Sequence, residues 1–219
     1  IRSVQGYSRR EKRRIDAHRP ITRVGLKKES PVIINHQQAQ ALKNCRVNNP
    51  QGKRDAFMMC LLLDHGLRVG EVSGLTQESI DTQKGLIRFF RAKVGKNQVH
   101  RMSQDTLHAA LDYLKVSPDL PPSDPLLCRS WKNGKLGRSG LTTRAISQRV
   151  EALGNEIGVP GLSAHDCRHY WATLAARAGT DPFSLQQAGG WSSLAMPRRY
   201  VEDNDVANEG IIIELPQSE

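Results

Sequence analysis

The spacing of apolar and polar positions along the chain predicts a mostly helical protein with one small antiparallel β-sheet. The longest unbroken apolar run, residues 57–63, is typical of a buried helix. Residues 86–91 are rich in aliphatic and aromatic side chains, and 98–102 return as a second strand after a turn at 94–97, which predicts a β-hairpin. We predict the longer helices at residues 35–45, 54–64, 104–115, 142–157 and 163–179.

Local signals indicate where several of these helices begin. Ser163 and Asp166 have the spacing of a capping box, which predicts a helix start at this point. Pro182, directly after Asp181, suits the first turn of a further short helix. The polar segment 48–52, which contains Gly and Pro, is expected to break the chain before the buried helix.

Positive charge is concentrated at the start of the chain. The 219 residues carry a formal net charge of +10; residues 1–30 contain ten Lys/Arg and three Asp/Glu, so they carry +7 and the rest only +3. Such a segment attracts polyanions through counterion release, which indicates nucleic acid, with a solvated tail as the alternative. We therefore expect a basic arm at residues 1–29, a folded domain at 30–203 and a C-terminal tail at 204–219. A second basic segment, 132–138, predicts a loop.

The composition excludes several classes of protein. No apolar run is long enough to span a membrane, and no apolar stretch follows the basic N-terminus as in a secretory signal. Cys45, Cys60, Cys128 and Cys167 are scattered without a C-x-x-C pair, which argues against a zinc site and for a reducing compartment. We therefore expect a cytoplasmic protein that binds no metal. Because the chain starts at Ile1 rather than Met, we also expect it to be a fragment of a longer protein.

Four side chains together offer the chemistry needed to cleave a phosphodiester: Arg68, His165, Arg168 and Tyr200. An enzyme that cleaves this bond without metal must neutralise the developing charge, supply a nucleophile and protonate the leaving oxygen. The planar fork of arginine binds two phosphate oxygens and stays charged. His165 and Arg168 are three residues apart, so one helix face presents both. Taken alone, Arg68 also fits a helix cap, and His165 fits a partly buried structural histidine.

Three segments together resemble the catalytic domain of the tyrosine recombinases, in wording closest to bacteriophage-type integrases. They are Gly-Leu-Arg-x-Gly-Glu-x-x-x-Leu at 66–75, His-Asp-x-Arg-His-x-x-Ala-Thr at 165–173, and Leu-Gln-x-x-Gly-Gly-Trp-x-Ser-x-x-Met-x-x-Arg-Tyr at 185–200. The resemblance covers roughly residues 30–203 and implies the tyrosine recombinase catalytic-domain fold, mostly α with a small antiparallel sheet.

The resemblance also implies a role for each motif residue. The implied catalytic set, supported by Glu71, consists of Arg68, Lys93, His165, Arg168, Trp191 and Tyr200. The two arginines grip the scissile phosphate, and the acidic residue supports the first of them. The histidine assists proton handling around the tyrosine nucleophile, and the tryptophan packs against the phosphate and donates its single N–H.

Two of these assignments have competitors. The family's lysine general acid lies on a β-hairpin, where Lys93, directly after the first predicted strand, is preferred over Lys96 in the predicted turn. Its pKa must be lowered by neighbouring cations or burial. Tyr170 is chemically equal to Tyr200, but it lies about 200° around the helix from Arg168, so Tyr200 is preferred as the nucleophile.

The implied function is site-specific DNA recombination, the integration or excision of a mobile element, by metal-free transesterification without a cofactor. The tyrosine forms a 3′-phosphotyrosyl link and releases a 5′-hydroxyl, and the 5′-hydroxyl of a partner strand reverses the step. The expected partners are double-stranded DNA, further protomers forming a tetramer on paired sites, and DNA-bending accessory proteins. A non-catalytic DNA-binding module on the same fold and a type IB topoisomerase are the alternatives.

Expectations also extend to the parts outside the motifs. Phosphate contacts are expected from arginines of the arm and of one helix: Arg9, Arg10, Arg13, Arg14, Arg144 and Arg149. The apolar segment 210–215 is expected to dock either on its own domain or on a neighbouring protomer. Relatives carry an N-terminal clamp domain, and this chain begins in what resembles the linker to it, so we expect weak cleavage by the chain alone.

Overall fold

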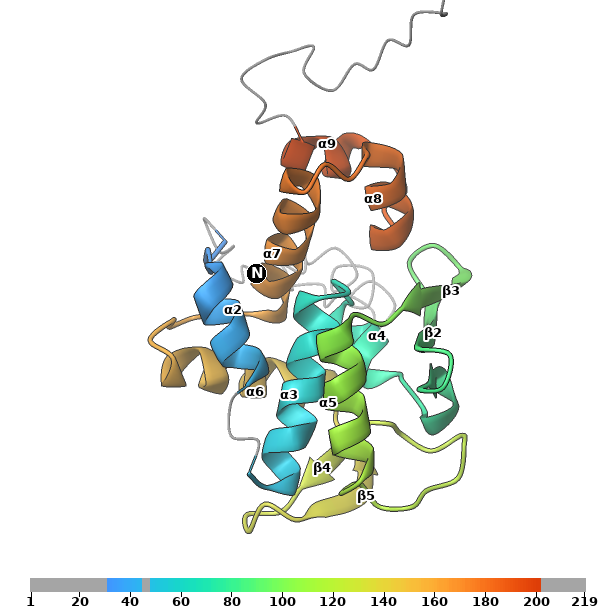
Figure 1. The fold of residues 1–219 in the computed structure, drawn as a ribbon, viewed down its shortest axis with the longest axis vertical. Helices are drawn as coiled ribbons and strands as arrows, with labels where there is room; N and C mark the ends of the chain where they lie inside the picture. Colours follow the sequence, from blue (N-terminus) through green and yellow to red (C-terminus); the bar gives the residue numbers. More distant parts are fainter. Residues whose placement is uncertain (1–30, 45–47, 202–219) are drawn as a thin grey trace, which may run out of the picture. The chain divides into compact units, whose positions relative to one another are not determined.

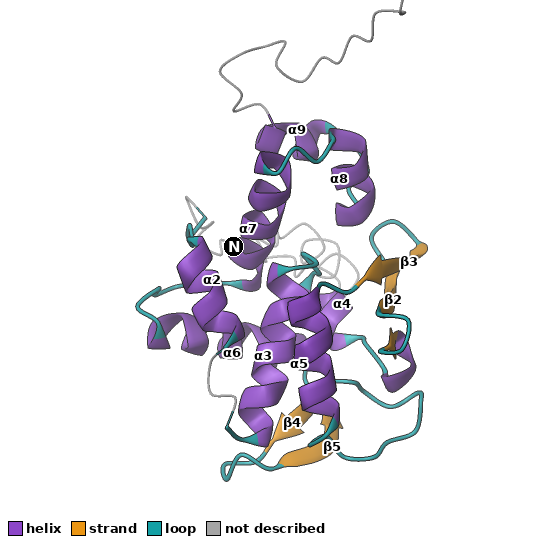
Figure 2. Cartoon of the chain, in the orientation of Figure 1, coloured by secondary structure: helices purple, strands orange, loops and turns teal. Residues whose placement is uncertain are grey.

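The computed structural model describes residues 31–44 and 48–201, which are mostly helical, as predicted, with strands in two small sheets (Figure 2). The helices are α2 (His36–Lys43), α3 (Pro50–Leu63), α4 (Val69–Ser73), the 3-10 helix η1 (Gln77–Ser79), α5 (Gln104–Leu114), α6 (Thr143–Glu156), α7 (Ala164–Arg177), α8 (Pro182–Gly189) and α9 (Ala195–Val201). The strands are β1 (Ile80–Asp81), β2 (Leu86–Arg91), β3 (Lys96–Arg101), β4 (Cys128–Ser130) and β5 (Leu136–Gly140). Within the described ranges, every helix is too short or too polar to cross a membrane.

Helix α3 lies at the centre of the hydrophobic core. Its residues 57–63 are at most 1% exposed, and the helix packs against α2, α5 and α7 (Figure 1). It begins earlier than predicted, at Pro50, because the Asn49 side chain accepts the Gly52 N–H at 2.8 Å and proline fits the first helical turn. The predicted chain break is therefore the capped start of this helix.

Strands β2 and β3 form the predicted hairpin, but its turn lies two residues earlier than predicted. The turn occupies residues 92–95, and Arg91 pairs with Lys96 at its base. Gly95 adopts φ +63°, a conformation that glycine accepts readily, and this closes the turn before Lys96. Lys93 therefore lies in the turn and Lys96 begins β3, which corrects the predicted arrangement. Strand β1, which was not predicted, pairs with the other edge of β2.

Strands β4 and β5 pair as a second antiparallel sheet that was not predicted. Cys128 lies opposite Gly140 and Ser130 opposite Leu136, with an irregularity between the two pairs. The predicted loop at 132–138 therefore includes the start of a strand. The sequence conceals these strands because β4 has only three residues and β5 contains two glycines, so neither shows a regular apolar alternation.

The C-terminal helices begin at their predicted caps. Ser163 and Asp166 form a capping box at the start of α7, in which the Asp166 carboxylate accepts the Ser163 N–H at 2.8 Å. The same carboxylate accepts the Val32 N–H at 3.0 Å, which fastens the segment before α2 to α7. At α8, Asp181 caps the helix and Pro182 occupies its first position. Helix α9 then packs against both α7 and α8.

Asp55 holds two arginines from distant parts of the chain inside the fold. It is 0% exposed, and its carboxylate accepts N–H groups from Arg54 at 2.7 Å and from Arg149 at 2.6 Å. Asp55→Ala should lower the free energy of unfolding by about 3–5 kcal/mol, because a buried guanidinium loses its counter-charge. Urea titration measures this change. As a control, Asp112→Ala removes an exposed pair with Lys115 and should cost less than about 0.5 kcal/mol; equal losses would contradict the prediction.

Candidate active site

The turn after α3 positions Arg68 at the start of α4. Gly66 adopts φ +58° in this turn, and Arg68 is the residue before the first turn of α4. The Glu71 carboxylate accepts the backbone N–H of Arg68 and its Nη1–H, both at 2.8 Å. Glu71 is buried, so the ion pair fixes the direction of the guanidinium. The predicted supporting contact between these two side chains is thus present in the geometry.

Arg168 lies on α7 and is held between two stretches of backbone. It is 5% exposed; its Nη1 donates to the Gly66 carbonyl and its Nη2 to the Gly189 carbonyl. Its guanidinium carbon lies 4.5 Å from the centroid of the Trp191 ring, a cation–π arrangement. Burial and two neighbouring guanidiniums lower its pKa to about 9, so the side chain stays charged at pH 7. These two bonds use two of its five N–H groups.

Arg91, at the end of β2, is a third cation near these two arginines, and sequence reasoning missed it. It is 0% exposed; its Nη1 donates to the Gly189 carbonyl and its Nη2 to the Ala188 carbonyl at 2.8 Å. Its Nε lies 3.6 Å from the Glu71 carboxylate, and burial lowers its pKa to about 10. Because β2 buries every second residue, Phe89 and Arg91 among them, its alternation was a signal for an inward-facing arginine.

The last carbonyls of α8 accept hydrogen bonds from all three arginines. The Ala188 carbonyl accepts from Arg91, and the Gly189 carbonyl accepts from both Arg91 and Arg168. The Gly190 carbonyl accepts the Arg68 Nη2–H at 3.1 Å. Gly190 ends α8 with φ +59°, and a Cβ at this position would overlap the Arg91 side chain. Glycine is therefore required here for two reasons. The negative end of the helix dipole also lies against the three positive charges and stabilises them.

A depression of about 290 Å³ opens beside α4 and the first turn of α7. It is lined by Arg68, Val69, Ser147, Ser163, Ala164, His165 and Arg168. Two guanidiniums and one imidazole thus converge on a single solvent-accessible space. This combination of charge and hydrogen-bond donors suits a phosphate group.

Tyr200 lies on α9 and reaches this region through a histidine that sequence reasoning missed. Its hydroxyl lies 3.0 Å from Nδ1 of His169, and Nε2 of His169 lies 3.1 Å from Nε2 of His165. Burial raises the pKa of Tyr200 above its usual value, although Arg168 and Arg199 act in the opposite direction. The arginines alone therefore do not make the tyrosine a phenolate in this arrangement. His169 follows Arg168 directly in the 165–173 motif, and this position was the one sequence signal that it belongs to the site.

Trp191 packs between the arginine cluster and the tyrosine. Its ring centroid lies 6.0 Å from that of Trp171, in a stacked arrangement, and 6.0 Å from that of Tyr200. A Cβ at Gly189 would overlap the Trp191 ring, so this glycine allows the indole to lie against the end of α8. The tryptophan thus limits the positions open to the Tyr200 ring and to Arg168.

The fold and the residues of this site agree with one family of proteins. The model of the phage integrase family matches residues 32–206. The chain belongs to this family, the tyrosine recombinases. The predicted family and fold class are therefore confirmed.

Several tyrosine recombinases resemble the chain in sequence or structure. The tyrosine recombinase XerC of Actinobacillus succinogenes is 31% identical over 185 residues, which are 83% of this chain and 61% of that protein. The crystal structure of XerA recombinase has a TM-score of 0.65 and 26% identity, over 80% of this chain and 62% of that one. XerH recombinase bound to its difH substrate has a TM-score of 0.61 and 21% identity, over 78% and 50%, a likeness in fold. The chain thus spans about three fifths of the length of the curated relatives it matches.

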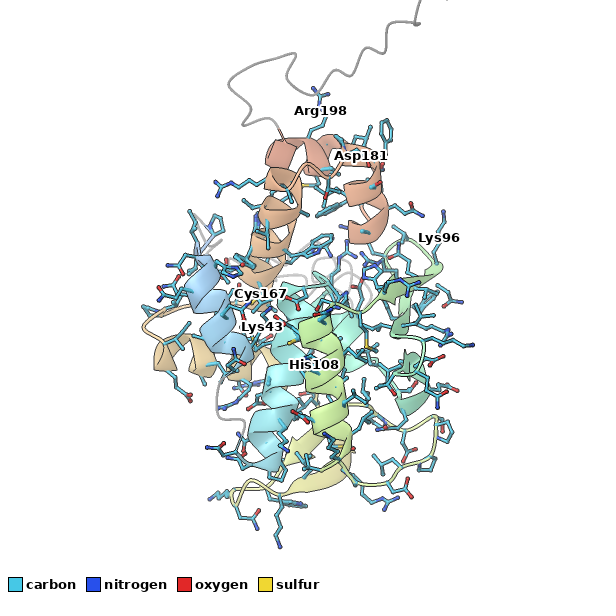
Figure 3. All side chains as sticks on the ribbon, viewed as in Figure 1. Lys43, Lys96, His108, Cys167, Asp181 and Arg198 are labelled. Carbon is cyan, nitrogen blue, oxygen red and sulfur yellow. The ribbon has the colours of Figure 1, made fainter. Side chains whose placement is uncertain are left out.

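Two lysines that are candidates for the general acid lie at the tip of the β2–β3 hairpin. Lys93 is exposed in the turn. Lys96, labelled in Figure 3, is exposed at the start of β3. Lys93 is preferred in the sequence because it follows the first predicted strand, whereas Lys96 falls in the predicted turn. The observed register reverses this, because Lys93 lies in the turn and Lys96 begins β3. Both lysines therefore stay candidates for the general acid.

The predicted DNA-contacting arginines differ in their surroundings. Arg9, Arg10, Arg13 and Arg14 lie outside the described residues. Arg144 is exposed on α6, where a phosphate can reach it. Arg149 is mostly buried and its Nε–H is donated to Asp55, so its geometry favours a structural role.

The other tyrosines in the described ranges are engaged elsewhere in the fold. The Tyr170 hydroxyl lies 3.3 Å from Nδ1 of His36, on the α2 side of α7. Tyr113 is buried in the core, where its hydroxyl donates to the Leu126 carbonyl at 2.8 Å. Of the tyrosines in the described ranges, Tyr200 is the one that contacts the histidine beside Arg168.

Proposed function

We propose that this chain is the catalytic part of a site-specific DNA recombinase that integrates or excises a mobile element through Tyr200. The observation that carries the proposal is the convergence of Arg68, Arg168 and His165 on one depression, with Tyr200 joined to it through a histidine. Membership of the tyrosine recombinases supports the same reaction class. The XerH structure is bound to its difH substrate and the Tn1549 transposon integrase structure to a circular intermediate DNA, which supports double-stranded DNA as the substrate here.

In the proposed first step, the hydroxyl oxygen of Tyr200 attacks the phosphorus of a DNA phosphodiester. A bond forms between this oxygen and phosphorus, and the bond to the 5′ oxygen breaks. Arg68 and Arg168 bind the non-bridging oxygens, where negative charge increases in the transition state. The Glu71 contact and the Gly66 and Gly189 carbonyls fix both guanidiniums before DNA binds, which reduces the reorganisation required.

The leaving 5′ oxygen needs a proton, and the proposed donor is Lys93 or Lys96 from the hairpin tip. The 5′-hydroxyl of a partner strand then attacks the phosphotyrosyl link, so the energy of the broken bond is kept and no nucleotide cofactor is consumed. Exchange between two duplexes requires more than one active site. We therefore propose a tetramer on paired DNA sites, with DNA-bending proteins as accessory partners.

A covalent-complex assay tests this function. Purified protein is mixed with supercoiled plasmid in EDTA, and the mixture is denatured, digested with trypsin and nuclease, and analysed by mass spectrometry. We expect a nucleotide on the peptide that begins at Tyr200, and relaxed plasmid in the same reaction. A nucleotide on residues 169–177 would identify Tyr170 as the nucleophile in place of Tyr200. An adduct that requires added Mg²⁺, or no adduct at all, would contradict the proposed chemistry.

A further inference from the structure

Two histidines on α7 form a continuous hydrogen-bonded chain from Tyr200 to the arginine-lined depression. We propose that His169 is a catalytic residue that takes the hydroxyl proton of Tyr200 and passes a proton on to His165. This inference rests on the proposed recombinase reaction and assigns the base that activates its nucleophile.

The geometry of the chain is set by helix spacing. His165 and His169 are four residues apart on α7, so they lie on one face, with ring centroids 4.6 Å apart and an interplanar angle of 85°. The centroid of His169 lies 5.5 Å from that of Tyr200, which α9 brings against α7. Both hydrogen-bond distances, 3.0 and 3.1 Å, lie in the range that proton transfer requires.

The hydrogen bonds also determine the tautomers that the chain needs. When Tyr200 donates its hydroxyl proton to Nδ1 of His169, the proton of neutral His169 lies on Nε2. That Nε2–H then donates to Nε2 of His165, whose own proton lies on Nδ1. Each donor between Tyr200 and His165 thus meets an acceptor.

The proton transfer balances without another reactant. As the bond from Tyr200 to phosphorus forms, the hydroxyl proton moves to Nδ1 of His169, and the proton on Nε2 of His169 moves to His165. His169 remains neutral with its proton on the other nitrogen, and His165 becomes an imidazolium. His165 lines the same depression as Arg68 and Arg168, so the new positive charge arises where the phosphate gains negative charge.

The surroundings suit this direction of transfer. Burial raises the pKa of Tyr200, so the hydroxyl keeps its proton until a base removes it. Burial and the nearby His165 lower the pKa of His169, with Asp166 acting in the opposite direction, so the imidazole is neutral near pH 7. The charged neighbours Arg168 and Arg199 carry no lone pair that accepts a proton at this pH.

Two variants separate proton transfer from simple positioning. His169→Ala removes the imidazole, whereas His169→Asn keeps a hydrogen-bonding group near the position of Nδ1 but accepts no proton. His108→Ala, at an exposed histidine on α5 (Figure 3), is the matched control. We expect both His169 variants to form the Tyr200 adduct about 100-fold more slowly than wild type, and His108→Ala to react at the wild-type rate. Thermal unfolding of each variant reports on folding.

A substrate with sulfur in place of the bridging 5′ oxygen assigns the defect to the nucleophile. Its thiolate leaves without a proton, so this substrate restores the cleavage rate of a variant that lacks the general acid but not of one that lacks the base. The His169 defect should therefore persist with it, and added imidazole should partly restore His169→Ala. A wild-type rate for the Asn variant, or loss of the defect with the sulfur substrate, would overturn the role of His169. Failure of the recombinase proposal would look different, because wild-type protein would then form no Tyr200 adduct with either substrate.

Discussion

Tyr200→Phe should abolish covalent attachment to DNA, lowering the rate of adduct formation by at least about 10⁴-fold, since a lost nucleophile is among the costliest active-site changes. The substitution removes one oxygen atom and keeps the ring that packs near Trp191 and His169. DNA affinity and the unfolding midpoint should therefore stay close to those of wild type. Denaturing gels with labelled DNA measure the adduct, and gel shifts measure binding.

The matched control for this experiment is Tyr170→Phe. Tyr170 is on the neighbouring helix, and its hydroxyl lies beside His36 rather than beside His169 or His165. This variant should form the adduct at the wild-type rate. An adduct that survives in Tyr200→Phe and disappears in Tyr170→Phe would exchange the two assignments.

Arg168→Ala should reduce cleavage by about 10³-fold while weakening DNA binding far less, because it removes donors aimed at charge that develops in the transition state. Arg168→Lys should recover little of this loss, since an ammonium group does not replace a planar fork that bridges the Gly66 and Gly189 carbonyls. Single-turnover cleavage rates and binding titrations at the same salt concentration give the two quantities.

A second arginine on the same helix provides the comparison. Arg177 is exposed at the end of α7, and Arg177→Ala should leave the cleavage rate unchanged. If Arg168→Ala lowered binding and cleavage by the same factor, its guanidinium would contribute to ground-state affinity instead of to the transition state.

Local sequence signals were sufficient to predict where a helix begins when its cap depends on residues close together in the chain. The capping box of Ser163 and Asp166 and the pair Asp181 and Pro182 depend on contacts within four residues, so the starts of α7 and α8 could be predicted. The turn of the β2–β3 hairpin could not, because the left-handed Gly95 shifts it by two residues.

The site was predictable in its motif residues but not in the groups that hold them. Arg91 binds carbonyls almost a hundred positions away, and no local pattern indicates which backbone an inward-facing arginine will meet. Arg149 resembled a surface cation, yet it pairs with Asp55, 94 positions earlier. His169 was overlooked because its partner on α9 is known only once the two helices are packed together.

The end of α8 contributes to the proposed active site through groups that side-chain substitution cannot remove. The groups that gather the three arginines are main-chain carbonyls of residues 188–190, and no side-chain substitution deletes a carbonyl oxygen. An alanine scan would therefore record steric damage at the two glycines and attribute none of the electrostatic organisation to them. Removing that contribution requires a change of the backbone itself, such as a thioamide at one position, whose sulfur accepts hydrogen bonds weakly. The positions of the three arginines thus depend on the path of the backbone at the end of α8 as well as on the side chains of the domain.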